Sequence, residues 1–525
     1  MKKHRILRRA AACTAALLLL ITLLPLQPLR AQAAERVVFS DKNFETVVRD
    51  YFFDGKTALT KANLDKVTHL KLETFESSPQ YINSYQDLLL FPNLESLTIS
   101  GFTIPNMSSF VSVCNQLPNL TEFRFLFGKN DWNQISGLKN LERLTIGNIS
   151  FDYTSTLRSL PRLQALEFDA TEISSLSMVN GLTNLRELTV RTNSYTGMAS
   201  LSGLSSLSGL KKLTLRTPYV NDFSALASLT KLETLTLEDT RIKDLSVLSG
   251  CKNLTYLTVS GPEYGGSSSQ GRVSDLSPLA GLTKLRRLNL ANNNISSLKP
   301  LSGLTALQEL DLSGNRVSSV APLKTLTNLR ILSVESAYDS AGFAGLTDIS
   351  PLASLTKLTR LSLCNNSITD ISPLSKLQSL ARLDISWNQV SNLSPLSSLS
   401  HLSHLDISHN QCSSLDALSG LTQLSSLSLS ANQVSDLSPV KKLSKLTYLD
   451  AEDNSITSAS PLSSCEQLNT LKLAGNKISN VSPLSALKKL KNLTLETKYV
   501  SDKKAAKDLF HKVESRRFLK LAKSK

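Results

Sequence analysis

From Leu285 to Leu490, apolar and polar residues alternate in a pattern that recurs about every 22 residues. The most regular copy is LARLDISWNQVSNLSPLSSLSH, residues 380–401. Within it, Leu383 and Ile385 alternate with polar neighbours, which predicts a short strand with one buried face. One copy cannot bury its own leucines, so we expect the copies to stack.

Two further features of this copy predict its turns. Asn388 follows the strand, and we expect its buried amide to hydrogen-bond backbone groups that a turn would leave unpaired. The pair Ser394-Pro395 stops a regular helix from starting early, so the return segment should be irregular or a short 3₁₀ turn.

The same frame extends over most of the chain. Its first positions are Val67, Leu94, Leu120, Leu141, Leu163, Leu185, Leu210, Leu232, Leu254, Leu285, Leu307, Leu329, Leu358, Leu380, Leu402, Leu424, Leu446, Leu468 and Leu490. We therefore predict one elongated domain of about 19 repeats over residues 67–497, although 525 residues would usually form several domains.

The N-terminal segment predicts secretion. Five basic residues precede Ala10, residues 10–24 are apolar, and Ala31-Gln32-Ala33 offers a cleavage site, so residues 1–33 are expected to be a signal peptide. A membrane anchor is the alternative, but the apolar run is shorter than the ~20 residues that a span needs. We expect no membrane span in the mature chain, and no Leu-Pro-x-Thr-Gly sorting motif lies near the C-terminus.

Both ends of the repeat domain are predicted to carry helical caps. Residues 34–66 should form the N-terminal cap, with Ser40 or Asp41 as N-cap, a helix ending at Asp54-Gly55, and a second short helix from Thr60. Its helical stripe is Phe44, Val47, Val48, Tyr51 and Phe52. Residues 498–525 should form a basic capping helix with the stripe Ala506, Leu509, Phe510 and Val513.

The net charge of +15 falls to about +9 when the six basic residues of the signal are removed. Residues 502–525 carry nine basic and three acidic residues. Such a tail could bind an anionic cell-wall polymer, but it has no base-reading motif, so no nucleic-acid partner is expected.

Five cysteines follow the signal, and we expect no disulfide framework. Cys251 and Cys465 occupy the position of Leu399, and Cys412 that of Val390, so they should be small core residues too far apart to pair. Cys364 should face the concave surface as the one accessible thiol.

The spacing L-x-x-L-x-L-x-x-N resembles a leucine-rich repeat. Together with the signal, the helical cap and the recurring Asp-Leu-Ser-Pro-Leu at 275–279, it resembles the internalin-type repeats of Gram-positive bacteria. The resemblance implies a leucine-rich-repeat solenoid of the α/β horseshoe type, with a parallel sheet on the concave face, an irregular or 3₁₀ convex side and helical caps at both ends. It also implies protein binding or adhesion through the concave face, with a host or bacterial surface protein as partner and a glycan as the alternative.

Enzymatic chemistry is not expected. The chain has no His-Glu-x-x-His, Gly-x-Ser-x-Gly, phosphate-binding glycine loop or Cys-x-x-Cys, and no cofactor is implied. One cluster, at His401, His404, Asp406 and His409, could approach a zinc site. Solvated polar positions on a sheet are the simpler explanation, so we predict no metal.

A binding surface is better supported. The outward positions are mostly Thr and Ser, for example Thr98, Thr214, Thr236, Thr258, Ser362 and Ser428. Larger residues that interrupt this neutral background are the partner-binding candidates, because aromatic residues and arginines dominate binding hot spots. They are Tyr256, Tyr264, Arg287, Glu309, Asp311, Glu335, Tyr338, Phe343, Arg382, Asp384, Trp387, His404, Asp406, His409 and Tyr448, with Arg360, Asp450 and Glu452 in similar places.

Trp387 is the sharpest of these candidates. It stands where other copies have Gly314, Asn365 or Ala431, and the alternative is that it only packs flat on its neighbours.

Two insertions break the period, within residues 261–272 and 337–347, both after a strand. We predict that their loops leave the same edge of the sheet, and that Tyr264, Tyr338 and Phe343 form one contact patch with the polar residues between them. Tolerated loop drift is the alternative.

The sequence thus predicts a secreted, non-enzymatic protein-binding or adhesion module that uses its concave face and edge loops. The alternative is a scaffold of the cell envelope that is retained through its basic tail.

Overall fold

The computed structural model describes residues 37–52, 59–73, 81–102, 104–126, 132–147, 154–169, 173, 175–192, 198, 200–261, 272–336 and 345–512. The chain divides into unit 1, Met1–Thr145 with Leu160–Arg162, and unit 2, Ile146–Ser159 with Leu163–Lys525. The predicted signal, the last thirteen residues and most of both insertions lie outside the described residues. None of the helices among the described residues has the length and apolar character needed to cross a membrane.

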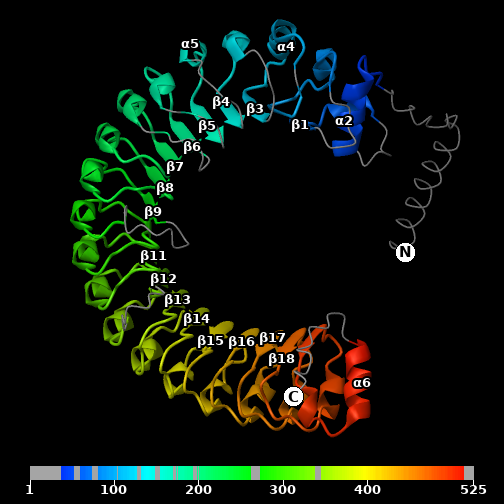
Figure 1. Cartoon of the computed structure of the whole chain (residues 1–525), viewed down its shortest axis with the longest axis vertical. Helices are drawn as coiled ribbons and strands as arrows, with labels where there is room; N and C mark the ends of the chain where they lie inside the picture. Colours follow the sequence, from blue (N-terminus) through cyan, green and yellow to red (C-terminus); the bar gives the residue numbers. More distant parts are fainter. Residues whose placement is uncertain are drawn as a thin grey trace, which may run out of the picture. The chain divides into compact units, whose positions relative to one another are not determined.

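Short parallel strands repeat along both units, and within each unit every strand pairs with the next one in sequence (Figure 1). Nineteen strands are found among the described residues. Their bounds are β1 His69–Glu73, β2 Ser96–Ser100, β3 Glu122–Leu126, β4 Arg143–Gly147, β5 Ala165–Asp169, β6 Glu187–Arg191, β7 Lys212–Arg216, β8 Thr234–Glu238, β9 Tyr256–Ser260, β10 Arg287–Asn289, β11 Glu309–Asp311, β12 Ile331–Ser333, β13 Arg360–Ser362, β14 Arg382–Asp384, β15 His404–Asp406, β16 Ser426–Ser428, β17 Tyr448–Asp450, β18 Thr470–Lys472 and β19 Asn492–Thr494. The predicted class, a leucine-rich-repeat solenoid, is confirmed.

In unit 2 the strands line the inner, concave side, and the return segments lie on the outer side (Figure 1). The return segments are mostly 3₁₀ turns, as the Ser-Pro pairs predict; the turn over Ser394–Leu396 is η12. The others are η1 Gln86–Leu90, η2 Trp132–Gly137, η3 Ser177–Val179, η4 Ser202–Ser206, η5 Ser224–Ser228, η6 Ser246–Leu248, η7 Ser277–Leu279, η8 Lys299–Gly303, η9 Ala321–Thr325, η10 Ser350–Ser354, η11 Ser372–Lys376, η13 Asp416–Leu418, η14 Ser438–Lys442, η15 Ser460–Ser464, η16 Ser482–Ala486 and η17 Thr497–Tyr499.

Two return segments form α-helix instead, α4 Met107–Cys114 in unit 1 and α5 Thr154–Arg158 in unit 2. Neither contains the Ser-Pro pair of the regular copies. In α4 the Asn106 side chain accepts a hydrogen bond from the backbone N–H of Ser109 at 2.9 Å and so caps the first turn.

A ladder of buried asparagines ties successive repeats of unit 2 together. Asn388 donates from Nδ2 to the carbonyls of Leu363, Ile385 and Ser386 at 2.9, 3.1 and 3.1 Å, and its Oδ1 accepts from the N–H of Ile368 at 2.9 Å. The predicted role of this residue is therefore confirmed. The same arrangement recurs at Asn293, Asn315, Asn366, Asn410, Asn432, Asn454 and Asn476.

The ladder also continues across both insertions. The N–H of Val273, which follows the first insertion, donates to Asn293 Oδ1 at 3.0 Å. The N–H of Leu346, which follows most of the second, donates to Asn366 Oδ1 at 2.8 Å. The asparagine hydrogen bonds between repeats are therefore the same on both sides of each insertion.

The first helix of unit 1, α2 Lys42–Phe52, begins at the predicted cap. Asp41 Oδ1 accepts from the N–H groups of Asn43 and Phe44 at 2.8 and 3.1 Å. The second helix, α3 Lys61–Leu64, follows Thr60 as predicted, whereas the predicted end at Asp54-Gly55 lies outside the described residues.

Helix α6 Lys503–Lys512 follows the last strand of unit 2. Asp502 Oδ1 accepts from the N–H of Ala505 at 2.8 Å, and the side chains of Ala506 and Leu509 are buried. The side chain of Phe510, and Val513 as a whole, lie outside the described residues. The described part of the stripe therefore covers the end of the unit 2 core, as a cap requires.

The five described cysteines are free thiols, of which Cys114, Cys251, Cys412 and Cys465 are buried. Cys364 is partly exposed, as predicted, and its Sγ lies 3.2 Å from Ser386 Oγ. Burial raises the pKa of the Cys364 thiol to about 11, so this thiol is largely protonated at neutral pH.

Candidate functional site

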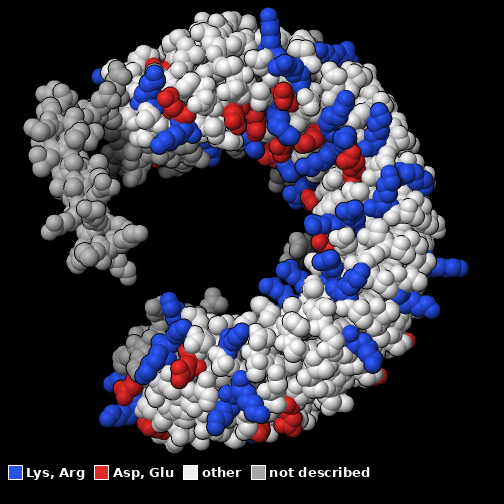
Figure 2. Space-filling model, turned by 180° about the vertical axis from the view of Figure 1, so that it is seen from behind, with Lys and Arg blue, Asp and Glu red and all other residues white. Residues whose placement is uncertain are grey.

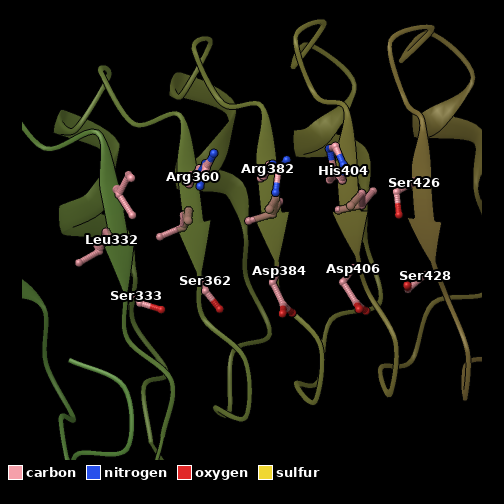
Figure 3. Close-up of a pocket in the computed structure, with 14 residues that line it drawn as sticks. Leu332, Ser333, Arg360, Ser362, Arg382, Asp384, His404, Asp406, Ser426 and Ser428 are labelled. Carbon is pink, nitrogen blue, oxygen red and sulfur yellow. The ribbon is translucent and has the colours of Figure 1, made fainter. Parts of the chain in front are cut away.

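An open hollow of about 350 Å³ lies on the strand face of unit 2, over the five strands β12 to β16 (Figure 3). Its ionisable lining residues are Arg360, Arg382, Asp384, His404 and Asp406. Its uncharged lining side chains include Ile331, Ser333, Ser362, Ser426 and Ser428. In each strand the central leucine is buried and its two neighbours point outward, so the pleat selects which residues line the hollow.

The charges of the hollow lie in two rows (Figure 3). Parallel register places Arg360, Arg382 and His404 side by side at the first position of β13, β14 and β15. At the third position Asp384 lies beside Asp406. Neighbouring residues in a row are ~4.8 Å apart along the sheet, and the two rows are roughly 7 Å apart along the strands.

Two groups in these rows are electrostatically perturbed. Burial, together with the charges of Arg382 and Arg360, lowers the pKa of His404, so the imidazole is neutral at pH 7. Burial raises the pKa of Asp406 and Asp384 adds to this, while hydrogen bonds from Ser408 act in the opposite direction.

Serine hydrogen bonds fix both carboxylates. Asp384 Oδ1 accepts from Ser386 N–H and Oγ at 2.9 and 2.6 Å. Asp406 Oδ1 accepts from Ser408 N–H and Oγ at the same two distances, 2.9 and 2.6 Å. The acidic row is therefore oriented before any ligand arrives.

Elsewhere in unit 2, opposite charges lie close together, as the adjoining blue and red side chains of Figure 2 show. Salt bridges join Arg191 to Glu167 at 2.5 Å, Arg216 to Asp239 at 2.8 Å, Arg287 to Glu309 at 3.2 Å and Lys472 to Asp450 at 2.8 Å. Arg360 and Arg382 are exposed, and neither forms a salt bridge with any described residue. The two arginines of the hollow therefore differ from the paired arginines elsewhere, because no described carboxylate neutralises their charge.

An aromatic pair follows the acidic row on the same two repeats. The rings of Trp387 and His409 stack with centroids 3.7 Å apart and planes inclined by 14°. Trp387 is 49% exposed, and its backbone is left-handed with φ of 54°. That conformation costs a residue with a side chain roughly 1–2 kcal/mol, and the stack offsets about 0.5–1.5 kcal/mol of it. The predicted alternative, a Trp packed flat, describes the stack on His409, although 49% of the Trp387 side chain remains exposed.

The structure places the sequence candidates in three groups. Arg382, Asp384, His404 and Asp406 line the hollow, and Trp387 and His409 follow it. A second group, Tyr256, Arg287, Glu309, Asp311, Glu335 and Tyr448, lies on or just after other strands of the same face. The third group, Tyr264, Tyr338 and Phe343, lies outside the described residues, as does the contact patch predicted for them.

Members of the second group are satisfied by their neighbours. Arg287 pairs with Glu309, Asp311 accepts from the N–H of Ser313 at 3.0 Å, and Glu335 accepts from Ser362 Oγ at 2.7 Å. The sequence could not separate these residues from those of the hollow, because pairing depends on neighbours about 22 residues away.

Sequence reasoning assigned Ser362 and Ser428 to the neutral background, yet both line the hollow, as do Ile331 and Ser426. The available signal was register: each of these residues has the same repeat position as a charged residue in a nearby copy. Ile331 and Ser426 with Ser428 lie on β12 and β16, the outer strands of the hollow, and the arginines, the histidine and the aspartates lie on the three strands between them.

The alternative of a zinc site at the histidines gains no support. Among the described residues, no three His, Cys, Asp or Glu side chains are placed to hold a metal ion. His409 stacks on Trp387, His404 Nδ1 shares a hydrogen bond with Ser403 Oγ at 2.9 Å, and His401 Nδ1 contacts the Gln378 carbonyl at 3.1 Å.

Comparisons with known proteins agree with this architecture. The family model described as leucine rich repeats (2 copies) matches residues 356–401, 400–442 and 444–486, and the model described as leucine rich repeat matches 273–317. The structure of an internalin (inlF) from Listeria monocytogenes is similar at 36% identity, over 57% of this chain and 84% of that chain, with a TM-score of 0.52. The chain belongs to the internalin family of leucine-rich-repeat proteins.

More distant structures share the fold alone. A leucine-rich-repeat protein of Leptospira interrogans is 21% identical over 82% of this internalin-type chain and 97% of its own, with a TM-score of 0.52. The ectodomain of the Arabidopsis thaliana receptor kinase GASSHO1/SCHENGEN3, solved in complex with CASPARIAN STRIP INTEGRITY FACTOR 2, is 22% identical over 81% of this chain and 56% of its own, with a TM-score of 0.57. No curated protein matches the chain significantly.

Proposed function

We propose that this internalin-type chain is an extracellular, non-enzymatic module that binds or adheres to a protein ligand through the strand face of unit 2. The invariant residues of each copy are used for the core and the turns, which leaves the outward positions free to vary with the ligand. Leucine-rich-repeat proteins are typical binding modules, and the internalin relationship supports the same role here.

One observation carries the proposal: Trp387 is exposed in a left-handed conformation, beside a hollow whose arginines form no salt bridge with any described residue. An exposed tryptophan in a strained backbone is unfavourable for folding alone. A ligand that covers it would remove a large apolar area from water, and Trp and Arg are the residues on which binding energy concentrates.

Selection from a displayed random-peptide library, with residues 34–525 as bait, tests this proposal. Peptides that bind the wild type should bind Trp387→Ala at least about tenfold more weakly, equivalent to about 1.4 kcal/mol. Tyr219→Ala is the matched control, since Tyr219 is another exposed aromatic of unit 2, 39% exposed. Equal binding to all three proteins, or selection of no peptide, would contradict the proposal.

The edge loops are part of the same proposal. If Tyr264, Tyr338 and Phe343 extend the contact surface, replacing all three with alanine should weaken the selected peptides or a larger protein ligand without lowering the Tm. Unchanged binding with an unchanged Tm would assign the two insertions to loop drift.

Export and retention can be tested on the full-length chain. A secreted product beginning at Ala34 would support cleavage of the signal. Truncation after Lys512 keeps α6 and removes only the last thirteen residues. Release of the truncated protein from the cell envelope would favour the alternative of a scaffold held on an anionic wall polymer by its basic tail; unchanged distribution would exclude it.

A further inference from the structure

The two-row arrangement of the hollow restricts the ligand further, and the inference rests on the proposed function. In β14 an arginine and an aspartate flank one buried leucine, and in β15 a histidine and an aspartate do the same. Both strands therefore present a basic or imidazole side chain and a carboxylate two residues apart on the same face. Opposite signs are separated in rows instead of being joined in pairs.

The basic row is positioned for a carboxylate. Arg360 and Arg382 are register partners, exposed and without a salt bridge to any described residue. Their guanidinium groups are carried on neighbouring strands ~4.8 Å apart, so like charges are brought together, and an anion placed between them would relieve the repulsion. Guanidinium groups bind planar carboxylates through two parallel hydrogen bonds, so a ligand carboxylate suits this row in shape as well as in charge.

The acidic row is positioned for a cation. Asp384 and Asp406 are also register partners, and their serine hydrogen bonds keep them aimed along one line. On each of these two strands, the other outward residue, Arg382 or His404, belongs to the basic row and lies roughly 7 Å away along the strand. A Lys or Arg side chain placed between them would form an ion pair with either carboxylate and offset one of the two negative charges.

We propose that the hollow binds an extended polypeptide segment in which an acidic residue and a basic residue are adjacent, with the acid on the Arg360–Arg382 row and the base on the Asp384–Asp406 row. The segment crosses the strands of unit 2, because successive side chains of an extended chain point to opposite sides and would reach the two rows in turn. The Trp387–His409 pair lies beyond the acidic row and offers the exposed part of the Trp387 side chain to a further residue of the segment.

Four acetylated and amidated octapeptides that differ only in their central pair test this directly: Glu-Lys, Glu-Ser, Ser-Lys and Ser-Ser, each within the same Ser and Ala flanks and one Tyr. Binding to residues 34–525 is measured by fluorescence polarisation at low and at physiological salt. The Glu-Lys peptide should bind about tenfold more tightly than either peptide with a single charge, and all charge effects should weaken with salt.

Two protein variants assign the rows. Arg382→Ser should abolish the advantage of Glu and keep that of Lys, whereas Asp406→Ser should do the reverse. Both changes introduce the residue that β16 has at the same repeat position, Ser426 or Ser428, so the fold should be retained. Lys212→Ser, which removes an exposed cation at the same repeat position of β7, outside the hollow, is the control and should change neither preference.

Equal binding of all four peptides, or an advantage of Glu-Lys that survives both variants, would overturn the inference. If library-selected peptides depend on Trp387 but show no preference for adjacent opposite charges, this inference fails and the proposed function stands. If no peptide binds at all, both fail.

Discussion

The turns after β8 and after β14 occupy the same place in the repeat, yet the buried polar side chains of the two turns differ in the number of hydrogen bonds that they form. Asn388 makes four hydrogen bonds, two of them to the preceding repeat. Thr240, in the equivalent position, is 4% exposed and its hydroxyl has no hydrogen-bond partner among the described residues. An amide has two donors and an acceptor on a side chain long enough to reach the next layer, whereas a hydroxyl is short and offers one donor.

The residue before this repeat position shows a second contrast, here between the residues that precede Thr240 and Asn432. Asp239 and Ala431 both have left-handed backbones, with φ of 49° and 52°. Asp239 also pairs with Arg216, while Ala431 has no polar side chain. In the regular repeats, the asparagine ladder thus stabilises a turn whose left-handed residue is locally unfavourable. The repeat that contains Asp239 has no such asparagine, and a surface ion pair stabilises its turn.

The largest expected effect comes from removing one member of the ladder. Asn388→Ala leaves three carbonyls and one N–H without that partner, and should lower the free energy of unfolding by about 3 kcal/mol. Urea unfolding followed by circular dichroism measures this. Gln389→Ala, at the exposed neighbouring position, should change it by less than about 0.5 kcal/mol. A loss below about 1 kcal/mol at Asn388 would show that the ladder does not hold the regular turns.

Relief of the left-handed turn should have a smaller effect of opposite sign. Ala431→Gly should raise the free energy of unfolding by about 1 kcal/mol, because glycine adopts this conformation without the Cβ clash. Asp239→Gly should gain less, since it also removes the ion pair with Arg216. Parallel thermal melts compare the two variants, and an equal or larger gain at Asp239 would contradict this account.

The unpartnered hydroxyl gives a third test. Thr240→Val removes a buried polar group that forms no hydrogen bond and keeps the side-chain shape, so the free energy of unfolding should stay the same or rise by up to about 1 kcal/mol. A clear loss in urea unfolding would mean that Thr240 has a bound water as partner.

The smallest expected effect concerns surface charge. Arg216→Ala should cost less than about 1 kcal/mol of stability and the loss should shrink in high salt, since both partners of its ion pair are partly exposed. Arg382→Ala should cost nothing measurable, because no described residue pairs with it. Melts at two salt concentrations distinguish these outcomes, and a loss at Arg382 as large as that at Arg216 would argue for a structural role.

Several features were accessible from the residues alone. The buried leucines, the hydrogen-bonding role of Asn388 and the 3₁₀ turn at Ser394–Leu396 follow from the order of residues within one copy. The outward position of Trp387 could be predicted from its place in the repeat. Its left-handed backbone was not predicted, but glycine or asparagine at that position in other copies indicates this conformation.

The sequence by itself determined the repeat, the core and the turns of this protein, because those depend on residues that are close together in the chain and recur at a fixed period. Only the tertiary structure decided which outward side chains meet. Register brings Arg360 beside Ile331, although an insertion lies between them, and places Arg287 beside Glu309, whereas Arg360 and Arg382 form no salt bridge with any described residue. Such pairing depends on stacking of whole repeats at ~4.8 Å, which no single copy encodes.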